Sequence, residues 1–166
     1  MVHVRIASLA MDPNTTQPVI VLKPLVEEPG HGRLLPIWIG HPEATAILLA
    51  LEGAQPPRPL SHDLMKSLLE SLDSYVERVE ITRVESGTFF ATITVRAEER
   101  SIMVDARPSD SIALAIRMNA PIFVAEEVLE SASVPDDFGV AEQDEESQLA
   151  EFREFLDAVD PEDFQS

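Results

Sequence analysis

The sequence predicts an α+β domain with a mixed, largely antiparallel sheet and helices packed on it. Runs of alternating or continuous Val, Ile and Leu predict strands near residues 2–10, 17–24, 34–39, 76–84, 88–97, 101–106 and 122–125. Apolar residues at helical spacing predict helices near residues 42–52, 61–73, 108–118 and 126–131. The strands come in groups with helices inserted between the groups, and this order is typical of α+β proteins.

Local residue chemistry supports each element in turn. The first helix, 42–52, is apolar nearly all round, which is typical of a helix buried in the protein or in a subunit interface. A rigid, extended connector follows at 55–59, and Ser61 is a candidate N-cap of the second helix. Residues 85–87 fit a short hairpin loop. Pro108 suits the first position of the third helix, because its missing N–H has no partner there.

Length and composition predict one domain with an acidic appendage. The chain has 166 residues, 45% of them hydrophobic, and residues 1–132 form the predicted domain. Residues 133–141 are a predicted hinge, and residues 142–166 an acidic amphipathic helix and tail. Residues 126–166 hold 15 acidic residues and one arginine, or −14 of the net charge of −18. We expect the apolar face of this helix to dock on the domain or on a neighbouring subunit. The alternative is that its negative charge competes with nucleic acid for the active surface.

The composition also excludes several classes of protein. The chain has no cysteine, so disulfides, thiolate catalysis and a cysteine-based zinc site are excluded. There is neither a signal peptide nor a run of about twenty apolar residues, so we expect a cytoplasmic protein without a membrane segment. No basic stripe of the kind that binds phosphate backbones is visible, since residues 1–125 hold 15 acidic and 11 basic residues.

The most informative segment joins the strand near 101–106 to the helix near 108–118. The strand period of two predicts that Asp105 and Arg107 share a face. Asp110 falls in the first helical turn, where the helix dipole favours a carboxylate. This charged cluster is either a site for a metal or a phosphate, or an arginine held between two carboxylates that fixes the junction.

Residues 34–51 repeat the same order of an apolar strand, a polar turn, a proline, an acidic residue and an apolar helix. Pro42 aligns with Pro108, and Glu43 stands at a helix start equivalent to that of Asp110. The repeat predicts an internal strand-turn-helix duplication.

A third group of polar residues precedes the second helix. His62 and Asp63 fall in its first turn, where backbone N–H groups attract an anion, and Arg58 just upstream is suited to phosphate. In the structural alternative, Asp63 complements the helix dipole and pairs with Arg58. His62 is a candidate general acid or base, and His41 is the alternative.

An ordered set of motifs resembles the bifunctional nuclease domain family over roughly residues 1–132. These motifs are PIWIG at 36–40, EA at 43–44, RPLSHDL at 58–64, GTFFA at 87–91, DARPSDSIALA at 105–115 and PIFV at 121–124. Ser111 stands where the family usually has alanine. The resemblance implies hydrolysis of both DNA and RNA.

Such a reaction needs a polarised water and a stabiliser for the charge that develops on the phosphate. We predict Glu43, Asp105 and Asp110 as ligands of Mg²⁺ or Mn²⁺, Arg58 and Arg107 as phosphate-binding residues, and His62 as the proton carrier. The apolar helix at 42–52, with Trp38 just before it, predicts a homodimer or a higher homo-oligomer. The alternative is a non-enzymatic oligomeric binding or regulatory protein in which the charged cluster is structural.

Overall fold

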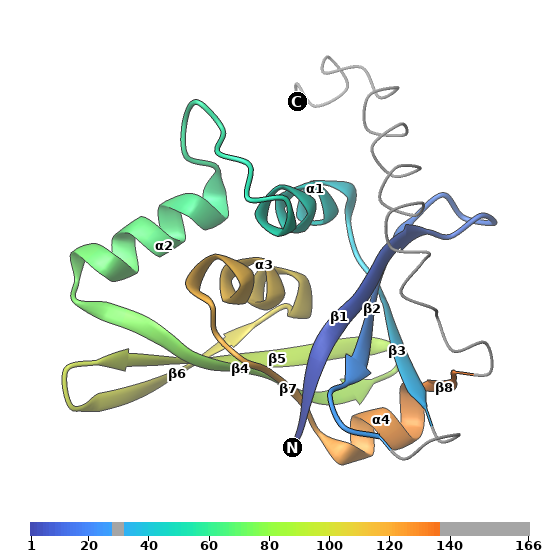
Figure 1. Ribbon diagram of the computed structural model, residues 1–166. Helices are drawn as coiled ribbons and strands as arrows, with labels where there is room; N and C mark the ends of the chain where they lie inside the picture. Colours follow the sequence, from blue (N-terminus) through green and yellow to red (C-terminus); the bar gives the residue numbers. More distant parts are fainter. Residues whose placement is uncertain (28–31, 137–166) are drawn as a thin grey trace.

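A computed structural model describes residues 1–27 and 32–136, so the predicted acidic helix at 142–166 and residues 137–141 of the predicted hinge lie outside the described part. Within it, eight strands form one sheet in the order β6-β5-β4-β7-β1-β2-β3-β8 (Figure 1). Only β4 and β7 pair in parallel. The strands are β1 (Val2–Met11), β2 (Pro18–Pro24), β3 (Arg33–Trp38), β4 (Ser74–Glu85), β5 (Thr88–Ala97), β6 (Arg100–Ala106), β7 (Ile122–Val124) and β8 (Val134–Pro135). The predicted α+β class is confirmed.

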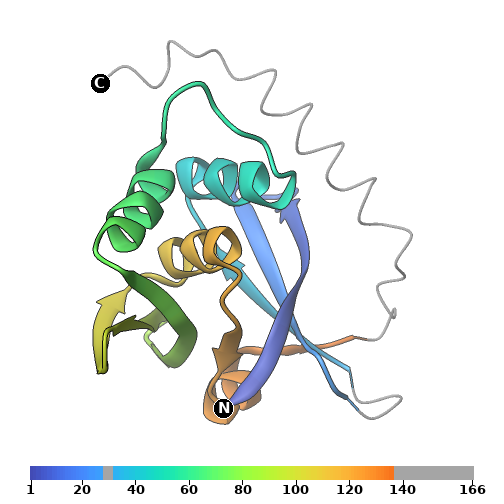
Figure 2. The ribbon, with the colours of Figure 1, turned by 60° about the vertical axis from the view of Figure 1, so that its left-hand side comes forward.

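Three of the helices lie together on one side of the bent sheet, as Figures 1 and 2 show. They are α1 (His41–Leu51), α2 (Ser61–Ser71) and α3 (Pro108–Met118). α3 is the central one, because it packs on both α1 and α2 as well as on β4 and β5. The short helix α4 (Glu126–Ala132) lies apart from them and packs on β3 and β4.

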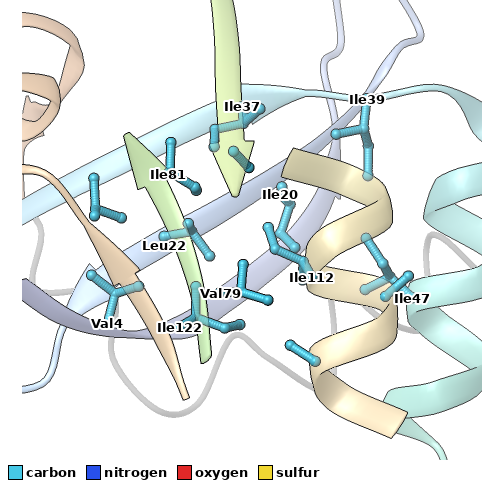
Figure 3. Packing of buried hydrophobic residues seen from close by; sticks show 14 of the residues in the cluster. Val4, Ile20, Leu22, Ile37, Ile39, Ile47, Val79, Ile81, Ile112 and Ile122 are labelled. Carbon is cyan, nitrogen blue, oxygen red and sulfur yellow. The ribbon is translucent and has the colours of Figure 1, made fainter. Parts of the chain in front are cut away.

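The core forms between α3 and the sheet. Ile112 of α3 is fully buried and meets Ile20 of β2 and Val79 of β4, while Ile47 of α1 lies against α3 (Figure 3). Alternation along β5 sends its buried apolar side chains toward the helices, as a half-buried strand requires. α1 and α3 are therefore held in place by burial of their apolar residues, whereas His62 is the buried residue of α2.

The sheet consists of two halves joined by the three-residue strand β7. On one side β7 pairs with β1 in antiparallel fashion, with Val2 opposite Val124. On the other side it pairs with β4 in parallel, with Val79 opposite Ile122. α1 follows the half that contains β3, whereas α2 precedes and α3 follows the half that contains β4, β5 and β6.

α1 and α3 begin and end in the same way. Each follows a strand and has a proline in its first two positions. A residue with positive φ follows each: Asn119, the C-cap of α3, at 52°, and Gly53, one residue after the C-cap Glu52 of α1, at 64°. The next N–H bonds back into the helix, from Ala54 to Leu49 O at 2.9 Å and from Ala120 to Ala115 O at 2.9 Å. The internal duplication stays a prediction, with which this shared geometry agrees.

One sequence expectation about the helices needs correction. Ser61 is the first residue of α2 and not its N-cap; the cap is Leu60, whose N–H donates to Asp63 Oδ2 at 2.9 Å. α1 buries Ala44, Ala46, Ile47 and Leu48 within the protein, which is one of its two expected placements, while Leu51 at its end is exposed. Further large exposed apolar residues lie on α2 and β6. In the described part of the chain, no helix is both long and apolar enough to span a membrane.

Candidate active site

The starts of α1, α2 and α3 surround a cavity of about 760 Å³. Four of the residues predicted from the sequence line it, one or two from each helix start: Glu43, His62, Arg107 and Asp110. The free N–H groups and the positive dipole ends of helix starts favour anions. Three such starts around one cavity favour the binding of an anion there.

Arg107 is the centre of the charged cluster. It is the N-cap of α3, and its Nε donates to Asp110 Oδ2 at 2.6 Å. Its Nη2 lies 2.7 Å from Glu43 Oε1 on α1. Its side chain is 65% exposed, whereas those of Glu43 and Asp110 are 16% and 25% exposed. The guanidinium therefore bridges α1 and α3 and keeps a solvent-facing edge.

The electrostatics of the cluster keep Asp110 ionised. Burial raises the pKa of Asp110, but hydrogen bonds from Arg107 and His62 outweigh burial and hold this pKa below its usual range. The hydrogen bond to Asp110 in turn raises the pKa of Arg107. The pair is thus an ion pair at neutral pH, and Asp110 can only accept hydrogen bonds.

His62 meets this cluster from α2. It is buried, and its Nε2 lies 3.0 Å from Asp110 Oδ1. Because the ionised carboxylate accepts, the imidazole must carry its proton on Nε2, which leaves Nδ1 as the basic atom of the neutral ring. An acidic residue that fixes the tautomer and orientation of a histidine in this way is a recurrent arrangement in hydrolytic sites.

Gly40 makes room for the Glu43 carboxylate. A Cβ atom at position 40 would collide with Glu43 Oε2. The backbone of Gly40 is extended, with a φ of −75° that any residue adopts, so the need for glycine here is steric and not conformational. The small residue before α1 therefore allows Glu43 to reach Arg107.

Two predicted site residues lie elsewhere. Asp105 pairs in register with Thr92, so it faces away from the side of the sheet on which Ala91 and α3 lie. The expectation that Asp105 and Arg107 share a face is wrong, because β6 ends at Ala106 and Arg107 turns into the helix cap. Arg58 is exposed in the α1–α2 connector and is not among the residues that line the cavity.

The three predicted metal ligands are therefore not brought together, since Asp105 faces the opposite side of the sheet from Ala91 and α3. Among residues 1–27 and 32–136, no three His, Asp or Glu side chains are grouped so that they could hold a metal ion. Glu43 and Asp110 remain on one wall, where both contact Arg107.

Sequence reasoning missed a second ion pair beside the cavity. Arg117 Nε donates to Asp63 Oδ1 at 2.6 Å and so joins α3 to α2. The partner of Asp63 is thus Arg117, and not Arg58 as in the structural alternative. The hydrogen bond from Arg117 lowers the pKa of Asp63. The two residues are 54 positions apart. The only sequence signal was the position of Asp63 in a first helical turn.

Arginines on the described part of the sheet pair with neighbouring acidic side chains. Three of the arginines of β4 and β5 pair with glutamates: Arg78 with Glu80 at 3.0 Å, Arg83 with Glu85 at 2.8 Å and Arg96 with Glu77 at 2.8 Å. Each of these partly exposed arginines therefore has its charge offset by a neighbouring glutamate.

Comparison with known proteins identifies the domain. The sequence profile of the bifunctional nuclease domain matches residues 24–137. An uncharacterized protein of Mycobacterium tuberculosis is 41% identical over 175 aligned positions that cover all of this chain and 99% of that protein. Bifunctional nuclease 1 of Oryza sativa is 32% identical over 63% of this chain, and bifunctional nuclease 1 of Arabidopsis thaliana is 31% identical over 64%. These matches cover only 32% and 33% of the two plant proteins. The chain therefore belongs to the bifunctional nuclease domain family.

Proposed function

We propose that the protein is a nuclease that hydrolyses phosphodiester bonds in DNA and RNA at the cavity between α1, α2 and α3. The observation that carries the proposal is the chain of contacts from His62 through Asp110 to Arg107 on the wall of this cavity. These contacts come from the starts of α2 and α3, and they support the roles of His62 as a candidate base, Asp110 as the carboxylate that orients it and Arg107 as a cation. The names of the plant relatives support the same class of reaction.

In this proposal His62 takes a proton from the attacking water through Nδ1, while Asp110 holds the ring and stabilises its charged form. Arg107 uses the edge of its guanidinium that faces neither carboxylate to bind a non-bridging phosphate oxygen. Electrostatic stabilisation of this kind contributes most where the charge grows in the transition state.

The charge of the cluster supports a role for a divalent cation. With neutral His62, one arginine faces two carboxylates, so the cluster has a net charge of −1, and a phosphodiester adds a further negative charge. Glu43 and Asp110 would hold Mg²⁺ or Mn²⁺ together with waters, a ligand set that Mg²⁺ accepts. Such an ion would compete with Arg107 for the same oxygens and would offset the charge of the substrate.

The decisive experiment measures cleavage of labelled single-stranded DNA and RNA by the protein and by His62→Gln and Asp110→Asn. Loss of a positioned base lowers the rate by about 10²- to 10⁴-fold. The matched control is His3→Gln, since His3 stacks on Phe123 at 4.9 Å in the distant β1–β7 pair. All variants are purified identically, so a contaminating nuclease would give equal rates in every preparation. Folded variants at cavity positions that retain full activity contradict the proposal.

The same contacts also support a second candidate, a non-enzymatic binding or regulatory protein. Both oxygens of Asp110 are already engaged, and Arg107, Asp110 and His62 together tie three helices. These contacts are sufficient for a purely structural role, in which the cluster locks the three helices together. If it is correct, substitutions in the cluster lower the stability of the protein, and any cleavage changes only in step with that stability.

We further infer that the chain forms a homodimer or a higher homo-oligomer through α2. This helix exposes Leu64, Leu68 and Leu72 on one stripe, by 52%, 55% and 71%. Contiguous apolar surface of this kind is typical of an interface. Self-association, which the sequence predicted through α1, is thus proposed here through α2.

A further inference from the structure

A second, smaller hollow adjoins the candidate active site. It has a volume of about 310 Å³ and is lined by the end of β3, the β4–β5 turn and the start of α3. Arg107 lines both hollows and is the side chain that they share. Both volumes fall in the range of about 300–1,000 Å³ that is usual for small-molecule sites.

The residues around the second hollow combine aromatic rings, hydrogen-bonding groups and a cation. Trp38 is 49% exposed, and its Nε1 donates to Asp12 Oδ2 at 3.0 Å, which fixes the indole. Phe89 and Thr88 come from the start of β5, and Ser109 from the first turn of α3. An exposed, fixed aromatic ring beside an arginine is how proteins bind bases of single-stranded nucleic acid, because each base has a face that can stack.

We propose that this hollow is a nucleotide subsite in which Trp38 stacks on a base of single-stranded DNA or RNA while Arg107 binds the adjoining phosphate. The inference rests on the proposed function, because it takes the larger cavity with His62 as the place of cleavage. The bound nucleic-acid strand lies across Arg107, with one nucleotide in each of the two hollows. A base within a duplex is already stacked on both faces, so the subsite selects single strands.

The first test uses Trp38 as its own probe, since it is the only tryptophan in the chain. A short oligothymidylate with phosphorothioate linkages is titrated into the protein, and the indole fluorescence is recorded. We expect saturable quenching that weakens as salt is added, and weaker binding of thymidine monophosphate, which occupies one hollow only. Absence of quenching at concentrations that saturate cleavage overturns the inference.

The second test separates binding from chemistry. Trp38→Ala should raise KM for single-stranded DNA by about 5- to 150-fold with kcat nearly unchanged, which corresponds to the ~1–3 kcal/mol of one base stacked on an aromatic ring. Trp38→Phe keeps a ring and should restore most of the affinity, and it replaces Trp38→Ala if that variant does not fold. The matched control is Tyr75→Ala, an aromatic residue on β4 that is 54% exposed and does not line the hollow.

The outcomes distinguish this inference from the proposed function. Quenching without any cleavage supports the subsite and contradicts the nuclease proposal. Cleavage without quenching, with a normal KM for Trp38→Ala, contradicts the subsite and leaves the nuclease proposal in place. Fluorescence that changes with protein concentration but not with oligonucleotide shows that a second copy covers Trp38, and this also overturns the inference.

Discussion

Replacement of Arg107 by alanine distinguishes the catalytic from the structural interpretation of the charged cluster. The change removes two ion pairs, to Glu43 and to Asp110. Because the Arg107 side chain is 65% exposed, solvent screens both pairs, and each contributes about 0–1 kcal/mol. We therefore expect a loss of about 0–2 kcal/mol and a fall in Tm of at most roughly 8 °C.

This loss is small beside the total stability of a domain, about 5–15 kcal/mol. At 25 °C the Arg107→Ala protein stays folded, with at most about 1% unfolded. If Arg107 stabilises the phosphate, the same change lowers kcat by about 10²- to 10³-fold. A loss of activity of that size cannot come from unfolding.

The matched control is Arg117→Ala, which also removes an ion pair between helices. The Arg117 side chain is only 7% exposed, so its loss leaves Asp63 partly buried and unpaired and costs about 3–5 kcal/mol. Arg117 does not line the cavity. The catalytic interpretation thus predicts that the less stable variant is the more active one, when cleavage is measured well below both Tm values. Activity that follows stability in both variants would refute the reasoning and favour the lock.

Four further predictions follow from the same contacts. The pKa values of Asp63 and Asp110 are lowered in the folded protein, so their contribution to stability is complete above about pH 4 and disappears as the pH falls through the folded values; acid denaturation should be less steep in Asp63→Asn and Asp110→Asn. Gly40→Ala pushes the Glu43 carboxylate off Arg107, and a double-mutant cycle with Glu43→Ala should show that the cost nearly vanishes once that carboxylate is absent. Cleavage should need Mg²⁺ or Mn²⁺ and stop with chelator, whereas equal rates in chelator exclude the metal. Light scattering should give at least twice the 18.3 kDa of one chain, and Leu68→Glu should return the mass to that of a monomer.

The parts of the fold that depend on local chemistry are predictable from the sequence. Pro108 and Asp110 mark the start of α3 through the missing N–H of proline and the dipole of the first turn, and the structure places the helix there. The turn at 86–87 follows because Ser86 and Gly87 both have positive φ, at 49° and 81°, as a two-residue hairpin needs.

What depends on distant parts of the chain is not predictable in this way. The period of two places Asp105 beside Arg107 only if the strand continues, and Arg107 leaves it to cap α3 and to reach Glu43 on another helix. The partner of Asp63 is likewise an arginine that tertiary packing brings near. Neither contact has a local signal, because both depend on how α1, α2 and α3 pack around one another.

The three-residue strand β7 determines when the site can form during synthesis. Glu43 belongs to the half of the sheet that is made first, and Arg107 to the half that is made later. Among the described strands, β7 joins the two halves by pairing with β1 and with β4. In the first of these pairings Val2 lies opposite Val124, although almost the whole domain separates them in sequence. Pairings this distant along the chain are slow to form, because a long loop must close first. We therefore expect that a growing chain on the ribosome brings Glu43 and Arg107 together in the cavity only after residue 124 has left the exit tunnel.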